Sequence, residues 1–341
     1  MPSKYTAPHI ANKVRKLRKA SIDVTLVFNK LIAGDKTALA QAITLIESTR
    51  ESDFQLAENL VNQCLTIPSK GIRIGITGVP GVGKSTFIEA LGGFLTAMGK
   101  KVAVLAVDPS SSFTKGSILG DKTRMETLAK DPNAFIRPSP ASDALGGVTR
   151  KTRETLILCE AAAFDVVLVE TVGVGQSETA VHSMVDFFLL LKLAGAGDEL
   201  QGIKRGIMEM ADAIVINKAD GSNLNQVKIA RGEFKRALHL YPPKENQWTP
   251  TVLSCSALHN LGIEAVWETI SHFMTMTKAN GHFAKNRTNQ NKNWFLQSVD
   301  ALLKHQFYAN SQTKDRLKQL LNQVETNQIS PYAAAKALVQ K

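Results

Sequence analysis

A glycine-rich segment of nine residues constrains the fold of this chain more than any other feature. The apolar run Ile72–Thr77 precedes the segment, and Phe87–Ala97 has a helical pattern after it, so the segment joins a strand to a helix. Backbone N–H groups of such a loop converge on phosphate oxygens at the helix N-terminus. The segment fits G-x-x-x-x-G-K-[ST] and predicts a P-loop in which every residue contacts a nucleoside triphosphate: Gly78, Val79, Pro80, Gly81, Val82, Gly83, Lys84, Ser85 and Thr86. We expect Lys84 to act on the β and γ phosphates and Ser85 to bind Mg²⁺.

Short apolar runs alternate with longer helical stretches through the middle of the chain. Continuous apolar runs separated by helices are typical of a parallel sheet that is covered on both faces. We therefore expect an α/β fold of the P-loop NTPase class, with a mainly parallel central sheet in a domain spanning residues 69–278. The predicted strands are Ile72–Thr77, Lys101–Val107, Asp165–Val169, Phe187–Leu193, Ala213–Ile216 and Thr251–Ser254.

Helical segments flank this predicted domain on both sides. Residues 1–68 form an N-terminal helical arm in which Gly34-Asp35 marks a turn. Residues 279–341 form a C-terminal helical segment, and its predicted amphipathic helices are Trp294–Phe307 and Arg316–Val324. In a monomer, the apolar side chains of the first of these helices would stay largely exposed to water, so we expect a homodimer held by this segment.

The charge and the cysteine content limit the class of protein. Lys and Arg number 41 against 30 Asp and Glu, a formal charge of +11, which favours anionic partners such as nucleotides, nucleic acid or acidic proteins. A basic surface exposed to solvent also accounts for the excess, and we expect neither nucleic acid nor a membrane as partner. The longest apolar stretch, near Phe187–Leu193, is far shorter than the ~20 residues that span a bilayer. The three cysteines have no CxxC spacing, which suits a reducing cytoplasm.

Two strand ends predict the base of the nucleotide. The run Ala213–Ile216 leads into N-K-x-D, which comprises Asn217, Lys218 and Asp220. A carboxylate here accepts from guanine N1–H and the 2-amino group together, whereas adenine would leave it unpaired, and the lysine stem covers the base. A second strand ends in Ser256-Ala257-Leu258, where a backbone N–H can meet guanine O6. We therefore expect GTP and GDP, with contacts from Asn217, Lys218, Asp220, Ser256, Ala257 and Leu258.

Three acids are candidates for the metal and for hydrolysis. Glu170 ends a buried strand, Asp108 ends another, and Asp121 lies in a polar loop. We expect all three to serve the Mg²⁺ ion and catalysis, and Gly173 to offer its N–H to the γ-phosphate. Asp108 precedes a proline and can instead open a turn, and Asp121 can instead cap a helix. Val174 follows Gly173 where Ras-like GTPases have a glutamine, so Gln176 is not assigned as the residue that orients water.

The glycine-rich segment 195–206 lies between a predicted strand and a helix, and it is either a mobile loop or a rigid connector. With it, a series of sequence blocks resembles the methylmalonyl-CoA mutase accessory GTPases of the MeaB/ArgK type. The resemblance covers nearly the whole chain, although the N-terminal arm matches more loosely. The blocks, in order, are GVPGVGKST, VDPSS, GSILGDKTRM, AFIRPSP, LGGV, ETVGVGQSE, GAGDELQGIK and NKAD.

This resemblance implies a homodimeric GTPase that binds an adenosylcobalamin-dependent acyl-CoA mutase, gates cofactor loading and protects the mutase. It places Asp108, Asp121 and Glu170 on the family's metal and catalytic acids, and Lys204 on a catalytic residue that docks toward the nucleotide in the partner complex. Older names in the family describe transport-system kinases, which gives the alternative of a P-loop kinase. A nickel-inserting GTPase is disfavoured, because the seven histidines are dispersed.

Overall fold

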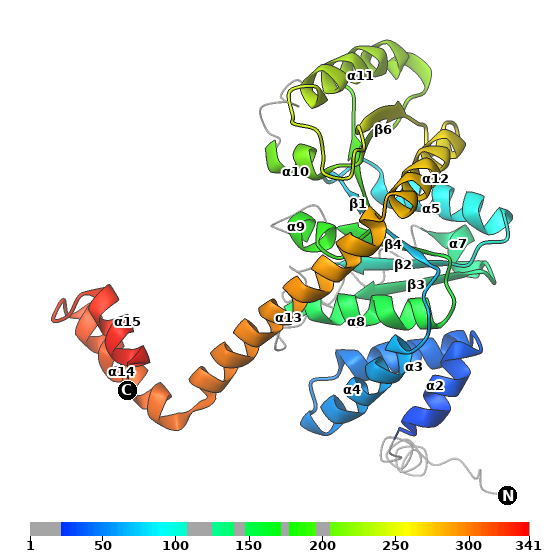
Figure 1. Cartoon of the computed structure of the whole chain (residues 1–341). Coiled ribbons are helices and arrows are strands. Elements are labelled where there is room, and N and C mark those ends of the chain that lie inside the picture. The colour runs from blue at the N-terminus through cyan, green and yellow to red at the C-terminus, as the bar shows by residue number, and fades with distance from the viewer. Residues whose placement is uncertain (1–21, 108–124, 140–146, 172–176, 196–204, 341) are drawn as a thin grey trace, which may run out of the picture.

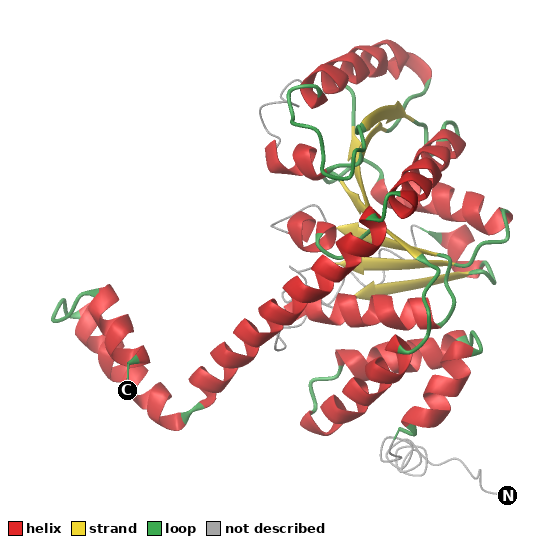
Figure 2. Ribbon diagram, in the orientation of Figure 1, coloured by secondary structure: helices red, strands yellow, loops and turns green. Residues whose placement is uncertain are grey.

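The computed structural model describes residues 22–107, 125–139, 147–171, 177–195 and 205–340. Seven strands form one sheet in the order β3-β2-β4-β1-β5-β6-β7, and every neighbouring pair is parallel. This arrangement confirms the predicted α/β class with its parallel sheet (Figure 2). The strands are β1 Ile72–Thr77, β2 Val102–Val107, β3 Ala134–Ser139, β4 Val166–Thr171, β5 Phe187–Lys192, β6 Ala213–Ile216 and β7 Thr251–Ser254.

The sequence pattern predicted six of these strands and missed β3. This strand lies at an edge of the sheet and carries Arg137 and Pro138, which interrupt its apolar run. An edge strand tolerates proline, because a backbone that lacks an N–H costs no ladder bond on its open side. Strand β4 also runs further than the predicted apolar run, so that Glu170 and Thr171 belong to the strand itself.

Side chains alternate between the two faces of the sheet, as the pleat requires. On one face, Ile74, Val104 and Leu168 pack against helices α5 (Lys84–Ala97) and α12 (Ile263–Ala279). On the opposite face, Leu105 and Val169 pack against α8 (Gly147–Ala161), with α9 (Ser177–His182) beside it. The remaining helices of this part are α7 Glu126–Lys130, α10 Arg205–Met210, the 3-10 turn Gly221–Asn223 and α11 Leu224–Leu238.

Three N-terminal helices pack on the outer side of α8 (Figure 1). They are α2 Val24–Ile32, α3 Lys36–Glu47 and α4 Glu51–Leu65. Asp35, the second residue of the predicted turn, caps α3 and accepts from the N–H of Thr37 at 2.7 Å. The fully buried Leu39, Ile43 and Leu60 join the same core as α8 and the sheet, so the helices are part of one hydrophobic core with that face of the sheet.

The C-terminal segment leaves the rest of the molecule on one long helix (Figure 1). Helix α13 (His282–Ala309) has 28 residues, which corresponds to about 42 Å of length. Helices α14 (Ser311–Glu325) and α15 (Pro331–Val339) pack on each other beyond its far end. Helix α13 begins well before the predicted start at Trp294, so the polar stretch before that residue is helical too. None of the described helices is long and apolar enough to cross a membrane.

Candidate nucleotide-binding site

The predicted phosphate-binding loop joins β1, the central strand of the sheet, to α5. Gly83 caps α5 with a φ of +92°, and a Cβ there would lie 2.7 Å from the side-chain nitrogen of Asn217. Gly78 has a φ of +155°, and a Cβ there would lie 2.7 Å from the carbonyl of Leu191. Only glycine fits both positions, because each combines a left-handed or strained backbone with a close neighbour. The loop therefore has the backbone geometry that its sequence pattern predicts.

Lys84 is the first residue of α5, and its side chain is buried. Its ammonium group turns back across the loop and donates to the carbonyl of Gly78 at 2.8 Å and to that of Val79 at 3.4 Å. The group is thus held over the inner side of the loop, where converging N–H groups favour phosphate. This position suits a cation that acts on phosphate oxygens.

Glu170 comes to the phosphate-binding loop from the neighbouring strand β4. The Ser85 hydroxyl lies 3.3 Å from a carboxylate oxygen of Glu170 and donates to it. One residue further along, the buried hydroxyl of Thr171 donates to that of Thr77 at 2.9 Å, which ties the end of β4 to the end of β1. The sequence pattern gave no signal for this second bond, because a threonine at the end of an apolar strand is common.

A Mg²⁺ ion fits the donors that meet at this point. A serine hydroxyl and a carboxylate are oxygen ligands of the kind that Mg²⁺ takes together with substrate phosphates and water. Ser85, in the first turn of α5, and Glu170, on β4, lie next to each other, so both can face one ion. Such an ion would neutralise charge on the phosphate oxygens.

Asn217 connects the phosphate-binding loop to both of the predicted base-binding segments. Its amide nitrogen donates to the carbonyl of Val82 at 2.9 Å, and its carbonyl oxygen accepts from the N–H of Ala257 at 3.1 Å. The thiol of Cys255 also donates to that oxygen, at 3.5 Å, and burial raises the pKa of this thiol to about 12, which keeps it protonated. The buried asparagine fixes three segments relative to one another.

Two residues of the N-K-x-D segment point to the place where a base would lie. The ammonium group of the exposed Lys218 donates to the carbonyl of Gly81 at 3.0 Å. The backbone of Lys218 has a φ of +60°, in the left-handed region. The Ser256 hydroxyl donates to one carboxylate oxygen of Asp220 in a short hydrogen bond. Ser256 follows β7 and Asp220 follows β6, so this bond fixes the orientation of the carboxylate from the neighbouring strand. A side chain that recognises one base specifically must be held in a fixed orientation.

The three backbone amides of the Ser256–Leu258 segment differ in what they bond. The Ser256 amide donates to the carbonyl of Leu261 at 3.0 Å, and the Ala257 amide donates to Asn217. Two of the amides thus hold the segment in shape. The amide of Leu258 has no acceptor among the described residues. Of the three amides, we therefore expect that of Leu258 to contact guanine O6.

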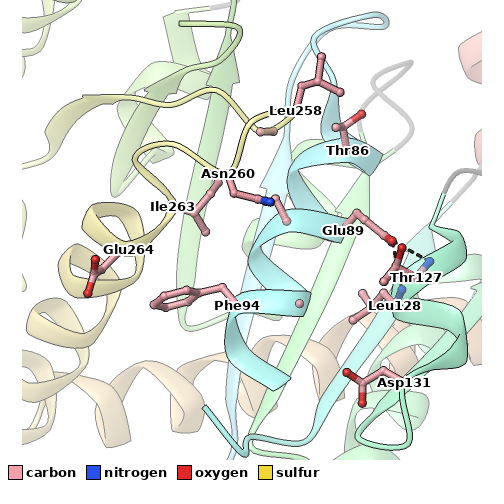
Figure 3. A pocket seen from close by; sticks show the side chains of 13 residues that line it. Thr86, Glu89, Phe94, Thr127, Leu128, Asp131, Leu258, Asn260, Ile263 and Glu264 are labelled. Carbon is pink, nitrogen blue, oxygen red and sulfur yellow. Dashed lines mark hydrogen bonds between the residues drawn. The ribbon is translucent and has the colours of Figure 1, made fainter. Parts of the chain in front are cut away.

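A cavity of about 610 Å³ extends along α5 from this point (Figure 3). Thr86 and Leu258, both predicted to bind nucleotide, lie together at one end of it. In its wall, one oxygen of Glu89 accepts from the amides of Thr127 at 2.9 Å and Leu128 at 3.1 Å. Glu89 therefore satisfies the first turn of α7 from a different helix, which sequence reasoning missed because no local capping pattern marks it.

The structure brings together most of the predicted site. The carboxyl ends of β1, β4, β6 and β7 meet at one edge of the sheet, where ligands of open α/β sheets bind. Four predicted residues lie outside the described residues, and their roles stay predictions: Asp108, Asp121, Gly173 and Lys204.

A family model described as methylmalonyl-CoA mutase-associated GTPase MeaB matches residues 39–312 of the chain. The chain belongs to the MeaB family. A probable GTPase of Mycobacterium tuberculosis is 48% identical over 307 residues, which cover 90% of this chain and 91% of that protein. The mitochondrial methylmalonic aciduria type A homolog of Mus musculus is 42% identical over 327 residues, which cover 93% of this chain and 79% of that protein.

The crystal structure of an LAO/AO transport system kinase has the same fold as this MeaB family member. It superposes with a TM-score of 0.76 at 39% identity and covers 94% of this chain and 99% of that one. Membership of the MeaB family makes the chain a GTPase that binds guanine nucleotide. The family assignment agrees with the P-loop and N-K-x-D segments, which lie at the same edge of the sheet.

Proposed function

We propose that this GTPase is an accessory protein of an adenosylcobalamin-dependent acyl-CoA mutase, with methylmalonyl-CoA mutase as the first candidate. In this role it gates loading of the cofactor and protects the mutase from inactivation. The observation that carries the proposal is the match to the mutase-associated MeaB model over residues 39–312. The name of the mouse relative, which refers to methylmalonic aciduria, supports the same partner.

The chemistry of the proposed cycle uses this chain's own groups. Lys84 stabilises the charge that develops between the β and γ phosphates, and the loop amides hold the phosphates in place. Ser85 and Glu170 hold Mg²⁺, together with Asp108 and Asp121. One of these acids also orients the attacking water, and Gly173 donates its N–H to the γ-phosphate. Asp220 and the Ser256–Leu258 segment select guanine.

We assign stimulation by the partner to segment 195–206. Glycine-rich segments have little conformational preference of their own, so contact with a partner can fix a cation near the phosphates. Lys204 is the cation that we propose for this role. Lys204→Ala should therefore remove most of the stimulation that the mutase gives. Full stimulation of this variant would exclude Lys204 from the mechanism.

The decisive experiment measures GTP turnover with and without purified methylmalonyl-CoA mutase. We expect the mutase to accelerate hydrolysis by the wild-type chain and not by Lys84→Ala, which controls for contaminating phosphatase. Unchanged turnover across a wide range of mutase concentrations, together with no co-elution of the two proteins, would contradict the proposal.

A P-loop kinase is the second candidate, because the solved structure with 39% identity carries the name of a transport system kinase. The two candidates differ in where the γ-phosphate goes. Incubation with γ-labelled GTP should release the label as inorganic phosphate if the chain is a GTPase. Stable label on a second protein or on an amino acid would favour the kinase.

We further propose that the chain forms a homodimer in which residues 279–341 are the dimerisation segment, with residues 69–278 as the GTPase domain and 1–68 as the arm. Apolar side chains on the projecting helix support this proposal, since Phe295, Leu296 and Leu303 expose 67%, 59% and 59% of their surface. A second copy would remove this surface from water. Light scattering of the full chain at micromolar concentration should give twice the monomer mass, and a monomer mass would contradict the dimer.

A further inference from the structure

The first part of α13 contacts a short stretch of chain, residues 183–186, which connects α9 to β5. Arg287 binds both carboxylate oxygens of Asp186, at 2.8 and 2.6 Å. Gln290 donates to the carbonyl of Val185 at 2.7 Å. Arg287, Gln290 and Trp294 are spaced i, i+3 and i+7, so they share one face of the helix. The helix that carries the C-terminal segment therefore contacts the α9–β5 connection through Arg287 and Gln290. Arg287 also donates to the carbonyl of Gly71 at 2.9 Å and pairs with Glu160 of α8 at 3.1 Å.

The third contact of this line passes through Arg153 of α8. Its guanidinium lies 5.8 Å from the ring centre of Trp294 and donates to the Ser183 hydroxyl at 2.7 Å. Ser183 is the first residue after α9, and its hydroxyl donates in turn to the carbonyl of Ala180 within that helix. Arg153 thus bridges the end of α9 and the face of α13.

Two buried N–H donors of this bridge have no hydrogen-bond acceptor among the described residues. The side chain of Arg153 is only 5% exposed, and its Nε is buried without an acceptor among the described residues. The indole N–H of Trp294 is also buried and also lacks an acceptor among the described residues. Burial, and to a lesser extent the nearby Arg73, lowers the pKa of Arg153 to about 10. Buried donors without acceptors are costly and rare in native structures, so two of them on neighbouring side chains call for a physical reason.

The position of α9 in the chain supplies that reason. Strand β4 brings Glu170 to Ser85 and ends at Thr171, and α9 begins at Ser177. In the sequence, residues 172–176, which lie outside the described residues, and then α9 separate the nucleotide end of β4 from Ser183. A small displacement of Ser183 would move the Arg153 guanidinium against the Trp294 ring, because interiors are close-packed.

We propose that the Ser183–Arg153–Trp294 contact transmits the nucleotide state of the site to α13. The present arrangement leaves two donors without acceptors, and the other arrangement gives at least one of them a partner. The inference rests on the guanine-nucleotide site and adds a route from that site to the C-terminal segment. The physical requirement for such coupling is an element with two arrangements that both sites bias.

The test uses the full chain labelled with 5-fluorotryptophan, which gives one ¹⁹F resonance for each of Trp248, Trp267 and Trp294. Spectra are recorded with Mg²⁺ and either GDP or a non-hydrolysable GTP analogue, and Trp294→Phe assigns the resonance. We expect the Trp294 resonance to differ between the two nucleotides. The variant Arg153→Lys keeps the charge but loses Nε and the planar guanidinium that faces the Trp294 ring. In this variant we expect the difference between the two nucleotides to disappear, while affinity for the GTP analogue stays within about twofold of wild type.

Arg150→Lys is the matched control, because Arg150 lies on the same helix, is more exposed than Arg153 and pairs with Glu154 instead of Ser183. It should keep the wild-type difference. A Trp294 resonance that is identical with both bound nucleotides in the wild-type chain would overturn the proposal and leave the GTPase assignment intact. Failure of calorimetry to detect binding of either nucleotide would instead overturn the guanine-nucleotide site and the proposal with it.

Discussion

The side-chain amide of Asn217 donates to the carbonyl of Val82 at 2.9 Å and so joins the end of β6 to the phosphate-binding loop. The same side chain accepts from the Ala257 amide at the end of β7. The segments predicted to bind phosphate and base are therefore connected through one buried residue. A base contact at one end and a phosphate contact at the other reinforce each other, because neither segment can move without breaking a buried hydrogen bond.

Replacing this asparagine should affect stability and binding together. Asn217→Ala leaves the Val82 carbonyl and the Ala257 amide without partners, and we expect the free energy of unfolding to fall by about 2–4 kcal/mol. GTP affinity should fall roughly tenfold or more, since the two segments lose their connection. Asn223→Ala is the control, because that side chain makes a similar bond to the Lys218 carbonyl at an exposed position. Denaturant titration and calorimetry measure both effects, and equal behaviour of the two variants would contradict the role of Asn217.

Lys84→Ala should abolish GTP turnover in a protein that remains folded. The variant removes the cation above the phosphate-binding loop, and charge-assisted hydrogen bonds of this kind contribute about 1.5–3 kcal/mol. GTP affinity should therefore fall roughly 10- to 150-fold. Lys101→Ala, an exposed lysine just before β2, should behave as wild type in the same phosphate-release and binding assays. Wild-type turnover by a folded Lys84→Ala protein would exclude the P-loop assignment.

Ser85 and Glu170 should act as one unit in the response to Mg²⁺. Ser85→Ala and Glu170→Gln each remove an oxygen ligand or its charge, so each should raise the Mg²⁺ concentration for half-maximal hydrolysis by roughly 10-fold or more. The double variant should cost less than the sum of the two, because the groups are 3.3 Å apart and share one ion. Glu264→Gln, an exposed acid of α12, controls for a general loss of charge. Additive effects in a Mg²⁺ titration would argue against a shared ion.

The sequence predicted β2, β4 and β5 from their apolar runs, because burial on both faces selects for such runs, and β1, β6 and β7 from shorter or interrupted runs next to recognisable motifs. It missed β3, whose edge position lets it carry Arg137 and Pro138. It also missed the first half of α13, since no apolar stripe marks a helix that is attached through polar groups. Arg287 and Gln290 make those attachments to residues about a hundred positions away. Long-range polar contacts of this kind leave no period in the sequence.

The candidate site, like the fold, could be predicted only in part from the sequence. Short motifs located Lys84, Ser85, Asn217 and Asp220, because their spacing is set by the loop that each motif forms. The bonds among the motifs were not predictable, since Val82 meets Asn217 and Ser256 meets Asp220 only after the sheet has formed. Glu89 was missed for the same reason, as the helix that it caps is remote in sequence.

The choice of base can be tested with Asp220→Asn, because the structure determines which oxygen of the carboxylate is replaced. Ser256 donates its hydroxyl to one oxygen of Asp220. In the variant the amide carbonyl can keep this bond, and the amide nitrogen then takes the position that faces the base. Guanine would meet a donor with its own 2-amino group, at a cost of about 1.5–3 kcal/mol, or roughly a 10- to 150-fold loss of GTP affinity.

Xanthine has an oxygen where guanine has the 2-amino group, so the new amide donor finds an acceptor. We therefore expect Asp220→Asn to bind XTP better than GTP, the reverse of the wild-type order. ATP should gain little, because its base still lacks the N1–H and the 6-oxo group that the Leu258 amide would contact. Asp300→Asn, an exposed position on α13, should keep the wild-type order. Competition binding of GTP, XTP and ATP decides the matter. If Asp220→Asn still prefers GTP to XTP, Asp220 does not read the base, and the N-K-x-D assignment at 217–220 is wrong.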